Sequence, residues 1–352
     1  MPVTVQNRVA VFDTKPYDRE FLEPAFHAAG IEAQFLRPRL GPDTVRLAEG
    51  ARIVCAFVND DLSTPVVDQL AAMGVGLIAL RCAGFNNVDF KSAYGRIHVA
   101  RVPAYSPYAV AEHAVALMLA LNRKTHKAWL RTRDSNFSIQ GLVGFDMHGR
   151  TAGIVGTGKI GRVLAGILRG FGMRVLAHDA FPDTAWAASA GVEFAGLDTL
   201  YREADVISLH CPLTPETRGM INAASIARMK RGVMLINTGR GKLIDSKALV
   251  AGLKSGRVGA AGLDVYEEEE RYFFEDFSAS GVDDDVLARL TTFPNVLITS
   301  HQAFFTREAL AHIAETTARN VRQFLDGAPL ENEICYQCCE GSCRRKTEGR
   351  CF

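Results

Sequence analysis

Short apolar runs alternate with longer segments of helical period along most of this chain. Runs of this length that are rich in valine and isoleucine are typical of strands buried on both faces. Because helical segments separate the runs, consecutive strands are predicted to be parallel, which indicates an α/β protein with doubly wound sheets. The predicted strands are residues 8–12, 53–58, 77–80, 151–155, 174–178, 205–210, 233–237, 259–264 and 296–299.

Two domains are predicted, because 352 residues exceed the usual size of a single domain. Pro103 and Pro107 precede a long apolar helix, which we interpret as the connection into a second domain. A last helical segment, residues 306–324, is expected to return to the first domain. The predicted division is residues 1–104 with 302–334, residues 105–301, and a tail of residues 335–352.

Charge and hydropathy exclude several classes of partner. The formal net charge is +1, so no overall field favours nucleic acid or an anionic membrane. The first residues lack the basic and apolar regions of a secretory signal. The longest apolar stretch, near residues 114–121, is far shorter than the ~20 residues of a membrane span. A cytoplasmic protein without nucleic-acid or membrane partners is therefore predicted.

Residues 151–161 read TAGIVGTGKIG, a strand followed by a glycine-rich turn and a helix. Gly156 permits the tight turn, Gly158 lets the backbone approach a pyrophosphate, and Gly161 lets the helix lie close to the strand. The helix N-terminus then directs its free N–H groups at the phosphates. The predicted phosphate-binding residues are Gly156, Thr157, Gly158, Lys159, Ile160 and Gly161.

The strand after this turn ends at Asp179, whose carboxylate can accept both hydrogen bonds of an adenosine ribose diol. The same charge would repel a 2′-phosphate, and no arginine follows in residues 180–182. NAD is therefore predicted rather than NADP. The alternative is a structural glycine turn beside a surface aspartate, which the agreement of strand, turn, helix and acid disfavours.

Polar residues follow three later strands. In doubly wound sheets, ligands bind at the carboxyl ends of the strands, which is where these residues are expected to lie. Arg240, between two glycines, can clamp a carboxylate, although it could also be a solvated surface arginine. His301 can be a general acid or base, although a lone histidine is more often structural. The acidic run 267–270 is usually a solvated face, but one member could orient such a histidine. Together they fit hydride transfer to a 2-keto acid, which needs a cation, a proton donor and a carboxylate that keeps the donor charged.

The segments 156–161, 237–241, 262–266 and 300–304 resemble the motifs of the D-isomer-specific 2-hydroxyacid dehydrogenase family. Within it, the chain resembles the fermentative D-lactate dehydrogenase branch, up to about Asn332. The resemblance implies a Rossmann NAD-binding domain at 105–301 and a discontinuous flavodoxin-like substrate domain at 1–104 and 302–334. It also implies a homodimer or homotetramer, formed through the helix after Pro107.

By this resemblance, Arg240 binds the substrate carboxylate and polarises the ketone, and His301 delivers the proton. Glu269 keeps His301 protonated and oriented, and is chosen because it has the family's offset from Asp264. The resemblance places four further residues at the substrate: Ala83, Gly84, Tyr105 and Phe304. It assigns these additional positions to the cofactor: Cys211, Pro212, Thr217, Thr238, Gly239 and Asp264.

The substrate is indicated by residues 271–278 and 283–287, which resemble an insertion typical of the lactate branch. Reduction of pyruvate to D-lactate with NADH is therefore the leading prediction. Two alternatives remain: a dehydrogenase for a larger 2-keto acid, and an NADH-sensing binding protein on the same fold.

The tail does not match the family pattern. Its thiols are Cys335, Cys338, Cys339, Cys343 and Cys351. Thiols this close together resemble the ligands of a metal or an iron–sulfur cluster. However, a second separated Cys-x-x-Cys pair is missing, so this is not a standard zinc pattern and no metal site is assigned. The other interpretation is a mobile basic tail with redox-sensitive thiols; disulfides are disfavoured in a reducing cytoplasm.

Overall fold

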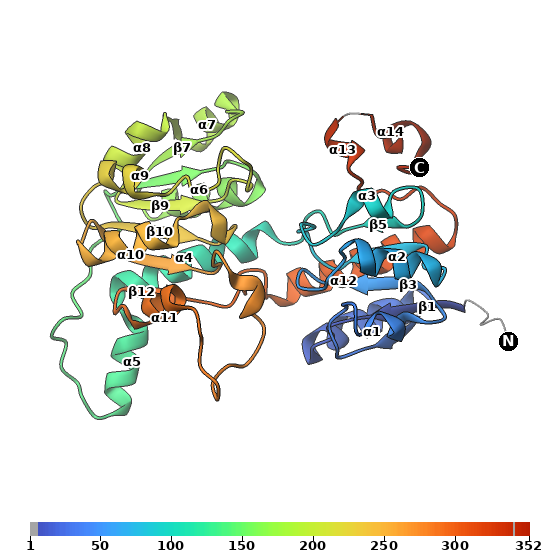
Figure 1. Cartoon of the computed structure of the whole chain (residues 1–352). Helices are drawn as coiled ribbons and strands as arrows, with labels where there is room; N and C mark the ends of the chain where they lie inside the picture. The colour runs from blue at the N-terminus through green and yellow to red at the C-terminus, as the bar shows by residue number, and fades with distance from the viewer. Residues whose placement is uncertain (1–5, 341) are drawn as a thin grey trace. The chain divides into compact units, whose positions relative to one another are not determined.

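The computed structural model describes residues 6–340 and 342–352 (Figure 1). The chain forms two compact units, and each is described by itself. Unit 1 comprises Met1–Ser106 and Phe305–Phe352, and unit 2 comprises Pro107–Phe304. The tail after residue 334 thus belongs with unit 1.

Unit 1 contains a five-stranded parallel sheet in the order β2-β1-β3-β4-β5, which is the flavodoxin-like order. Its strands are β1 (Gln6–Val11), β2 (Glu32–Phe35), β3 (Ala51–Ala56), β4 (Leu77–Leu80) and β5 (His98–Ala100). Its helices before the tail are α1 (Pro16–Ala28), η1 (Val45–Ala48), α2 (Thr64–Ala72), α3 (Phe90–Ala93) and α12 (Arg307–Leu325).

The core of unit 1 explains why the chain returns to it after unit 2. Leu22 and Phe26 of α1 pack with Val321 and Phe324 of α12 against alternate residues of the central strands. Alternation of this kind is expected, because successive side chains of a strand point to opposite faces. Without α12, this apolar face of the sheet would be partly uncovered.

Unit 2 contains a seven-stranded parallel sheet in the order β12-β11-β10-β9-β6-β7-β8. Its strands are β6 (Thr151–Val155), β7 (Arg174–His178), β8 (Glu193–Phe194), β9 (Val206–Leu209), β10 (Val233–Asn237), β11 (Val258–Leu263) and β12 (Val296–Ile298). Its helices are α4 (Pro107–Arg123), α5 (Thr125–Arg133), α6 (Lys159–Gly170), α7 (Thr184–Ala190), α8 (Leu197–Glu203), α9 (Ala223–Arg228), η2 (Gly241–Leu243), α10 (Ser246–Lys254), η3 (Glu269–Arg271) and α11 (Asp285–Thr292).

Both faces of this second sheet are covered. Alternate strand residues such as Ile154 and Met234 pack with helices α4 and α6. Their neighbours, such as Val155 and Leu235, pack with helices α8 to α11 on the other face. Two parallel-sheet units with helices on both faces confirm the predicted fold class. The strand order reverses between β6 and β9, and the carboxyl ends of strands at such a point are where doubly wound sheets bind ligands.

Three strands were not among those predicted from the sequence: β2, β5 and β8. β2 and β8 are edge strands, and β2 alternates exposed and half-buried residues, including Glu32 and Gln34. A strand with no fully buried residue gives no continuous apolar run. β5 and β8 have only three and two residues, too few for a periodic pattern.

The tail folds against unit 1. It contains two short helices, α13 (Gln337–Glu340) and α14 (Arg345–Glu348). Ile334 N–H donates to the carbonyl of Val99 at 2.8 Å, which extends the open edge of β5. The ring of Phe352 stacks on His98 with centroids 4.4 Å apart. In the described part of the chain, no helix is both long and apolar enough to cross a membrane.

Candidate active site

The glycine turn lies at the carboxyl end of β6 and has the geometry that its residues require. Gly156 has φ +96°, and a Cβ there would lie 2.5 Å from the backbone nitrogen of Cys211. A Cβ on Gly161 would lie 2.0 Å from the carbonyl oxygen of Gly156. By contrast, a Cβ on Gly158 would meet no atom within 4 Å. The first and third glycines are therefore fixed by close packing, and the middle one faces open space where a pyrophosphate fits.

Asp179 lies just after β7, beside this turn. Its carboxylate accepts hydrogen bonds from the N–H and hydroxyl of Thr157 at 2.6 and 2.8 Å and from the N–H of Phe181 at 2.9 Å. Burial acts to raise the pKa of Asp179, but these hydrogen bonds outweigh it and the pKa lies below its usual value. The carboxylate is therefore ionised and held in place, as recognition of a ribose diol requires.

Two loops carry the other predicted cofactor residues. Cys211, Pro212 and Thr217 follow β9, and the hydroxyl of Thr217 donates to the carbonyl of Pro212 at 2.7 Å. Burial raises the pKa of Cys211 to about 11, so its thiol is neutral. Thr238 follows β10, and its hydroxyl is buried without a hydrogen-bond partner among the described residues. An orphaned buried hydroxyl is costly, and a hydrogen bond to a bound nucleotide would satisfy it.

Arg240 follows Thr238 and Gly239 on the same loop, immediately before η2. Asn237 shapes this loop, because its side chain accepts from Gly239 N–H at 3.0 Å and donates to the carbonyl of Arg240 at 2.9 Å. A Cβ on Gly241 would lie 1.9 Å from the carbonyl oxygen of Tyr266, so only glycine fits there. The half-buried guanidinium is thus carried on a backbone with little freedom.

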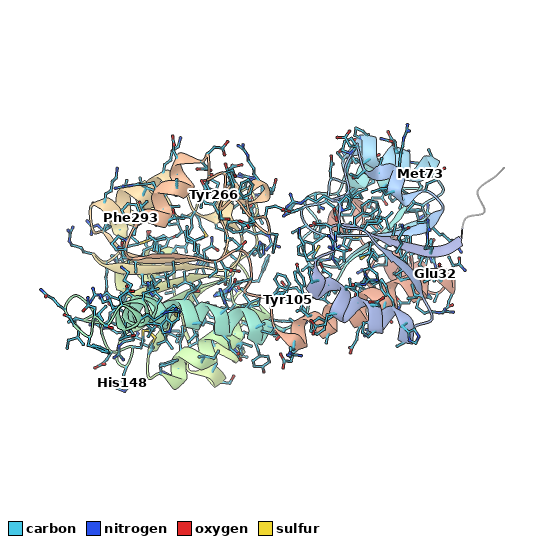
Figure 2. All side chains as sticks on the ribbon, turned by 90° about the horizontal axis from the view of Figure 1, so that it is seen from below. Glu32, Met73, Tyr105, His148, Tyr266 and Phe293 are labelled. Atoms are coloured by element: carbon cyan, nitrogen blue, oxygen red, sulfur yellow. The ribbon has the colours of Figure 1, made fainter. Side chains whose placement is uncertain are left out.

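Glu269 and His301 form a hydrogen-bonded pair, with His301 Nδ1 and Glu269 Oε1 2.9 Å apart. The other carboxylate oxygen of Glu269 accepts from the N–H of Tyr266 at 2.9 Å; Tyr266 is labelled in Figure 2. The side chain of His301 is 22% exposed and that of Glu269 is 19% exposed, so the pair is sheltered but accessible. Because Nδ1 is engaged, the ring presents Nε2 for proton transfer. A protonated imidazole held in this way can act as a general acid.

The backbone of His301 is held in an unusual conformation, with φ +50°. Positive φ is uncommon outside glycine, and it persists where the surroundings hold it firmly. Here the N–H of His301 donates to the carbonyl of Asp264 at 2.8 Å. The carboxylate of Asp264 accepts from the N–H groups of Gln302 and Ala303 at 2.9 and 2.8 Å. Asp264 is fully buried, and its hydrogen bonds to these N–H groups hold the loop that carries His301 in place.

Sequence reasoning missed two members of this network, His113 and Thr299. The hydroxyl of Thr299 donates to Asp264 Oδ1 at 2.5 Å, and Nε2 of His113 lies 3.0 Å from Thr299 Oγ1. His113 comes from α4, far from the other members in sequence. The only signal was a histidine within an otherwise apolar helix, which more often indicates a structural role.

The insertion that indicated the lactate branch lies beside His301. The ring of Phe274 stacks near the imidazole, with centroids 6.2 Å apart and an interplanar angle of 29°. Its N–H donates to the hydroxyl of Ser300 at 3.3 Å. Phe304, the predicted apolar wall, is 8% exposed. Both rings come from unit 2 and give this region an apolar character.

The remaining predicted substrate residues belong to unit 1. The backbone N–H groups of Ala83 and Gly84 have no acceptor among the described residues. The carbonyl of Ala83 accepts from the guanidinium of Arg101 at 2.8 Å, which fixes the loop. The carbonyl of Tyr105 lies 3.1 Å from Nδ1 of His312. Contact of these residues with the same substrate as Arg240 stays a prediction.

Comparison with known proteins identifies this arrangement. The model of the D-isomer specific 2-hydroxyacid dehydrogenase, NAD binding domain, matches residues 115–303. The chain is 51% identical over 328 residues to the D-lactate dehydrogenase of Escherichia coli strain K12, covering 93% of this chain and 99% of that protein.

Two solved structures are similar over nearly their whole length. The structure described as the pyruvate reductase of Chlamydomonas reinhardtii has a TM-score of 0.88 and 44% identity, covering 94% of this chain and 99% of that one. The D-lactate dehydrogenase from Lactobacillus jensenii, solved with NAD⁺, has a TM-score of 0.79 and 31% identity, covering 93% and 99%. The chain therefore belongs to the D-isomer-specific 2-hydroxyacid dehydrogenase family, in its D-lactate dehydrogenase branch, and is an NAD-dependent oxidoreductase.

Proposed function

We propose that this enzyme reduces pyruvate to D-lactate with NADH. The observation that carries the proposal is the hydrogen-bonded pair of Glu269 and His301, whose nearest atoms are 2.9 Å apart. Its two members follow β11 and β12, and Arg240 follows β10, which is the next strand in the sheet. The carboxyl ends of three neighbouring strands thus supply a proton donor, its orienting carboxylate and a cation.

Arg240 binds the carboxylate of the substrate in this proposal. Its planar guanidinium matches a carboxylate with two parallel hydrogen bonds and draws electron density from the neighbouring ketone. The family resemblance assigns Ala83 and Gly84 to the same carboxylate, and their half-buried backbone N–H groups, which have no acceptor among the described residues, are suited to an anion. Tyr105 supplies a further substrate contact from unit 1.

His301 donates a proton to the ketone oxygen as negative charge develops there. Glu269 orients the ring and sets a negative charge against the imidazolium, so the ring carries its proton toward the substrate. The rigid loop held by Asp264 keeps Nε2 in one position, and positioning of this kind contributes directly to rate. After transfer, His301 is neutral and regains a proton from solvent.

The residues present fit NADH, which supplies the hydride when bound. The glycine turn and the N-terminus of α6 hold the pyrophosphate, and Asp179 holds the adenosine ribose. Thr238, whose hydroxyl has no partner among the described residues, and Gly239 follow β10 and would contact the cofactor when it is bound. Cys211, Pro212 and Thr217 line the nucleotide from the loop after β9. Asp264 acts on the nicotinamide side through the loop that it organises.

Pyruvate is proposed as the substrate because its side chain is only a methyl group. The ring of Phe274 lies beside His301, and the family resemblance places Phe304 at the substrate side chain; apolar walls of this kind suit a small side chain. Relatives named D-lactate dehydrogenase and pyruvate reductase, at 51% and 44% identity, support the same choice. Selectivity between keto acids of different size depends on few contacts, so it needs a direct test.

The test is NADH oxidation with pyruvate beside hydroxypyruvate, glyoxylate and 2-ketoisocaproate, with chiral analysis of the product. The expected result is the highest kcat/KM for pyruvate, with D-lactate as the only enantiomer of lactate formed. Preference for 2-ketoisocaproate would keep the mechanism and replace the substrate. NADH binding without turnover of any keto acid would overturn the proposal in favour of an NADH-sensing protein.

A further inference from the structure

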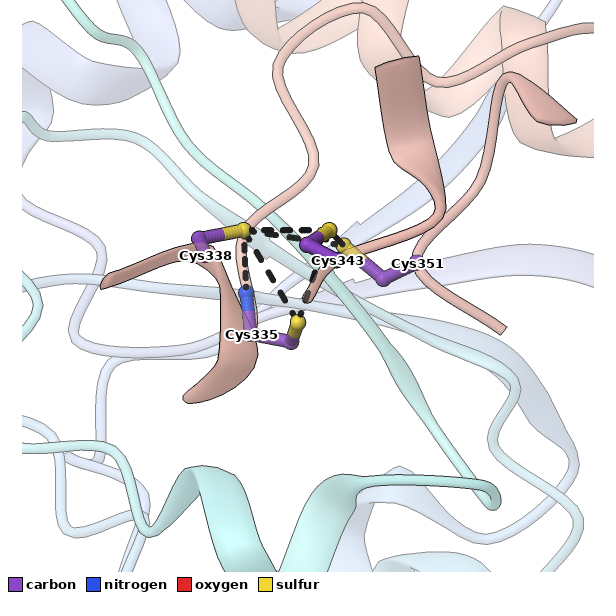
Figure 3. Close-up of side chains that lie close together, drawn as sticks. All are labelled: Cys335, Cys338, Cys343 and Cys351. Atoms are coloured by element: carbon purple, nitrogen blue, oxygen red, sulfur yellow. Dashed lines mark hydrogen bonds between the residues drawn. The ribbon is translucent and has the colours of Figure 1, made fainter. Parts of the chain in front are cut away.

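Four cysteines of the tail bring their sulfur atoms together: Cys335, Cys338, Cys343 and Cys351 (Figure 3). All four sulfurs lie within 4.8 Å of one another. Sγ of Cys343 is 3.4 Å from that of Cys338 and 3.4 Å from that of Cys351. Sγ of Cys335 is 3.7 Å from Cys338 and 3.8 Å from Cys343. The side chain of Cys339, the fifth thiol of the tail, lies outside the described residues.

These distances match the edges of a tetrahedron around a single metal ion. A zinc ion bound by four thiolates has Zn–S bonds of about 2.3 Å, which places the sulfurs about 3.8 Å apart. Five of the six sulfur pairs are 3.4–3.9 Å apart, which is close to this value, and the sixth pair, Cys335 and Cys351, lies within 4.8 Å. In a cluster with several irons, the thiolates bind different iron atoms. Their sulfur atoms are therefore farther apart than they are here. The sulfurs are also too far apart to be bonded as disulfides.

The surrounding backbone shapes the group as a site. The N–H of Cys335 donates to Sγ of Cys338 at 3.3 Å, and the N–H of Arg345 donates to Sγ of Cys343 at 3.5 Å. Such N–H groups favour deprotonated sulfur, which is the form that binds metal. Cys335 and Cys351 are 7% and 0% exposed. The group therefore has donors aimed at its sulfurs and shelter from solvent, unlike thiols scattered on a mobile tail.

Contacts through Glu333 connect the group to strand β5. The N–H of Cys351 donates to Glu333 Oε2 at 2.5 Å, and the other oxygen of Glu333 lies 2.5 Å from Nδ1 of His98. Glu333 is fully buried. The guanidinium of Arg345 donates to the carbonyl of Glu333 at 2.6 Å. The rings of Tyr336 and Phe352 also pack on Tyr94 and His98, but the tail has few other apolar side chains, so without a metal ion these contacts would hold it weakly.

We propose that Cys335, Cys338, Cys343 and Cys351 bind one Zn²⁺ ion, which fixes the tail against strand β5 of unit 1. Binding replaces four thiol protons, which are released to solvent, by four Zn–S bonds, and no electron is transferred. All four positions are filled by protein, which is typical of structural rather than catalytic zinc. The resulting complex is anionic, and the basic side chains of Arg344 and Arg345 in the same segment offset its charge.

The first test measures metal in the whole protein, purified without a histidine tag and with a phosphine reductant in place of thiols. Elemental analysis is expected to find one zinc per chain in the wild type. Cys343→Ser is expected to retain less than a tenth of this amount. Cys55→Ala is the matched control, because it removes a thiol from the core of the same unit and is expected to retain full zinc.

The second test does not depend on a variant that folds. Zinc is removed from the wild type with a chelator, and Co²⁺ is added while the absorption spectrum is recorded. Four thiolates around Co²⁺ are expected to give intense visible bands and a strong sulfur-to-metal charge-transfer band, which saturate at one equivalent. Zn²⁺ should then abolish both bands by displacement.

Three results would overturn the proposal: a wild type without zinc that shows no thiolate bands with Co²⁺, equal zinc in wild type and Cys343→Ser, or iron with acid-labile sulfide in place of zinc. The third would assign the thiols to an iron–sulfur cluster. Each of these results is independent of the substrate, because no activity is measured.

Discussion

The two functional clusters of this enzyme are assembled in opposite ways. Arg240, Glu269 and His301 are far apart in sequence and follow three neighbouring strands of unit 2. The four cysteines come from residues 335–351 alone, which lie beside the edge of β5 and contain no strand among the described residues. A side chain carried by a buried sheet keeps its place when a neighbour is replaced. A cluster made of loops and single helical turns has no such support and depends on the metal that it binds.

The comparison predicts that the strand-borne residues determine rate and not fold. The sharpest case is His301→Ala, which removes the proton donor. We expect kcat to fall by about 10²- to 10⁴-fold, the usual contribution of a general acid. NADH affinity and the melting temperature should change little. Single-turnover kinetics and NADH fluorescence titration measure these quantities, with the exposed His148→Ala as control. A large loss of melting temperature in His301→Ala would contradict the contrast.

Arg240→Lys tests whether geometry, as well as charge, binds the substrate. Lysine keeps the charge but lacks the planar fork that matches a carboxylate. We expect kcat/KM for pyruvate to fall by roughly 10- to 100-fold, the loss of one charged hydrogen bond. The rate with Arg240→Gln should be lower still. Steady-state kinetics on both variants measure these changes. Equal kcat/KM in Arg240→Lys and wild type would show that a positive charge alone suffices to bind the substrate.

Removal of zinc from the wild type should affect the tail and leave both sheets intact. We expect amide hydrogen exchange in residues 335–351 to become faster by roughly tenfold or more, because local opening of this segment then costs less free energy. Exchange in strands β1 to β12 should not change. Mass spectrometry of peptic fragments, with zinc restored as the control, makes the measurement. Faster exchange throughout unit 1 would show that the tail supports the whole unit, which would break the comparison.

The smallest expected effect concerns the loop that carries His301. Thr299→Val removes a hydrogen bond to buried Asp264 and the contact with His113. We expect the free energy of unfolding to fall by about 1 kcal/mol. The kcat should fall less than in His301→Ala, with KM nearly unchanged, because the histidine is misplaced and not removed. Thr299→Ser retains the hydroxyl and should restore kcat. Chemical denaturation and kinetics on both variants provide the readout.

The sequence predicted best those positions where the local structure permits only one type of residue. Gly156 and Gly161 are fixed by contacts under 3 Å that any Cβ would make, so their pattern was specific. Asp179 and His301 follow apolar strands, and a polar residue directly after such a strand is readily recognised in the sequence. Edge strand β2 was not predicted, because a half-exposed strand has no continuous apolar run. The role of His113 was not predicted, because His113 comes near Thr299 and Asp264 only when α4 packs on the sheet.

The cysteine group shows a different limit. The spacing of the tail thiols matched no standard zinc pattern, so the sequence left metal, cluster and free thiols as alternatives. Spacing rules describe loops of known shape, whereas here α13, α14 and the end of β5 set the positions of the sulfurs. Only the folded backbone brings Cys351 back to Cys338, with their sulfurs 3.9 Å apart.

Arg101 connects the proposed carboxylate loop with the segment that leads into the tail. Its guanidinium donates to the carbonyl of Ala83, its backbone N–H donates to the carbonyl of Asn332, and burial together with the positive charge of Arg345 lowers its pKa. Whatever free energy couples the two sites through Arg101 acts equally in both directions. A keto acid bound at the loop would then change the affinity for the metal by the same factor by which the metal changes the affinity for the keto acid. The concentration of substrate would thereby become one of the conditions that set what fraction of the protein carries its ion.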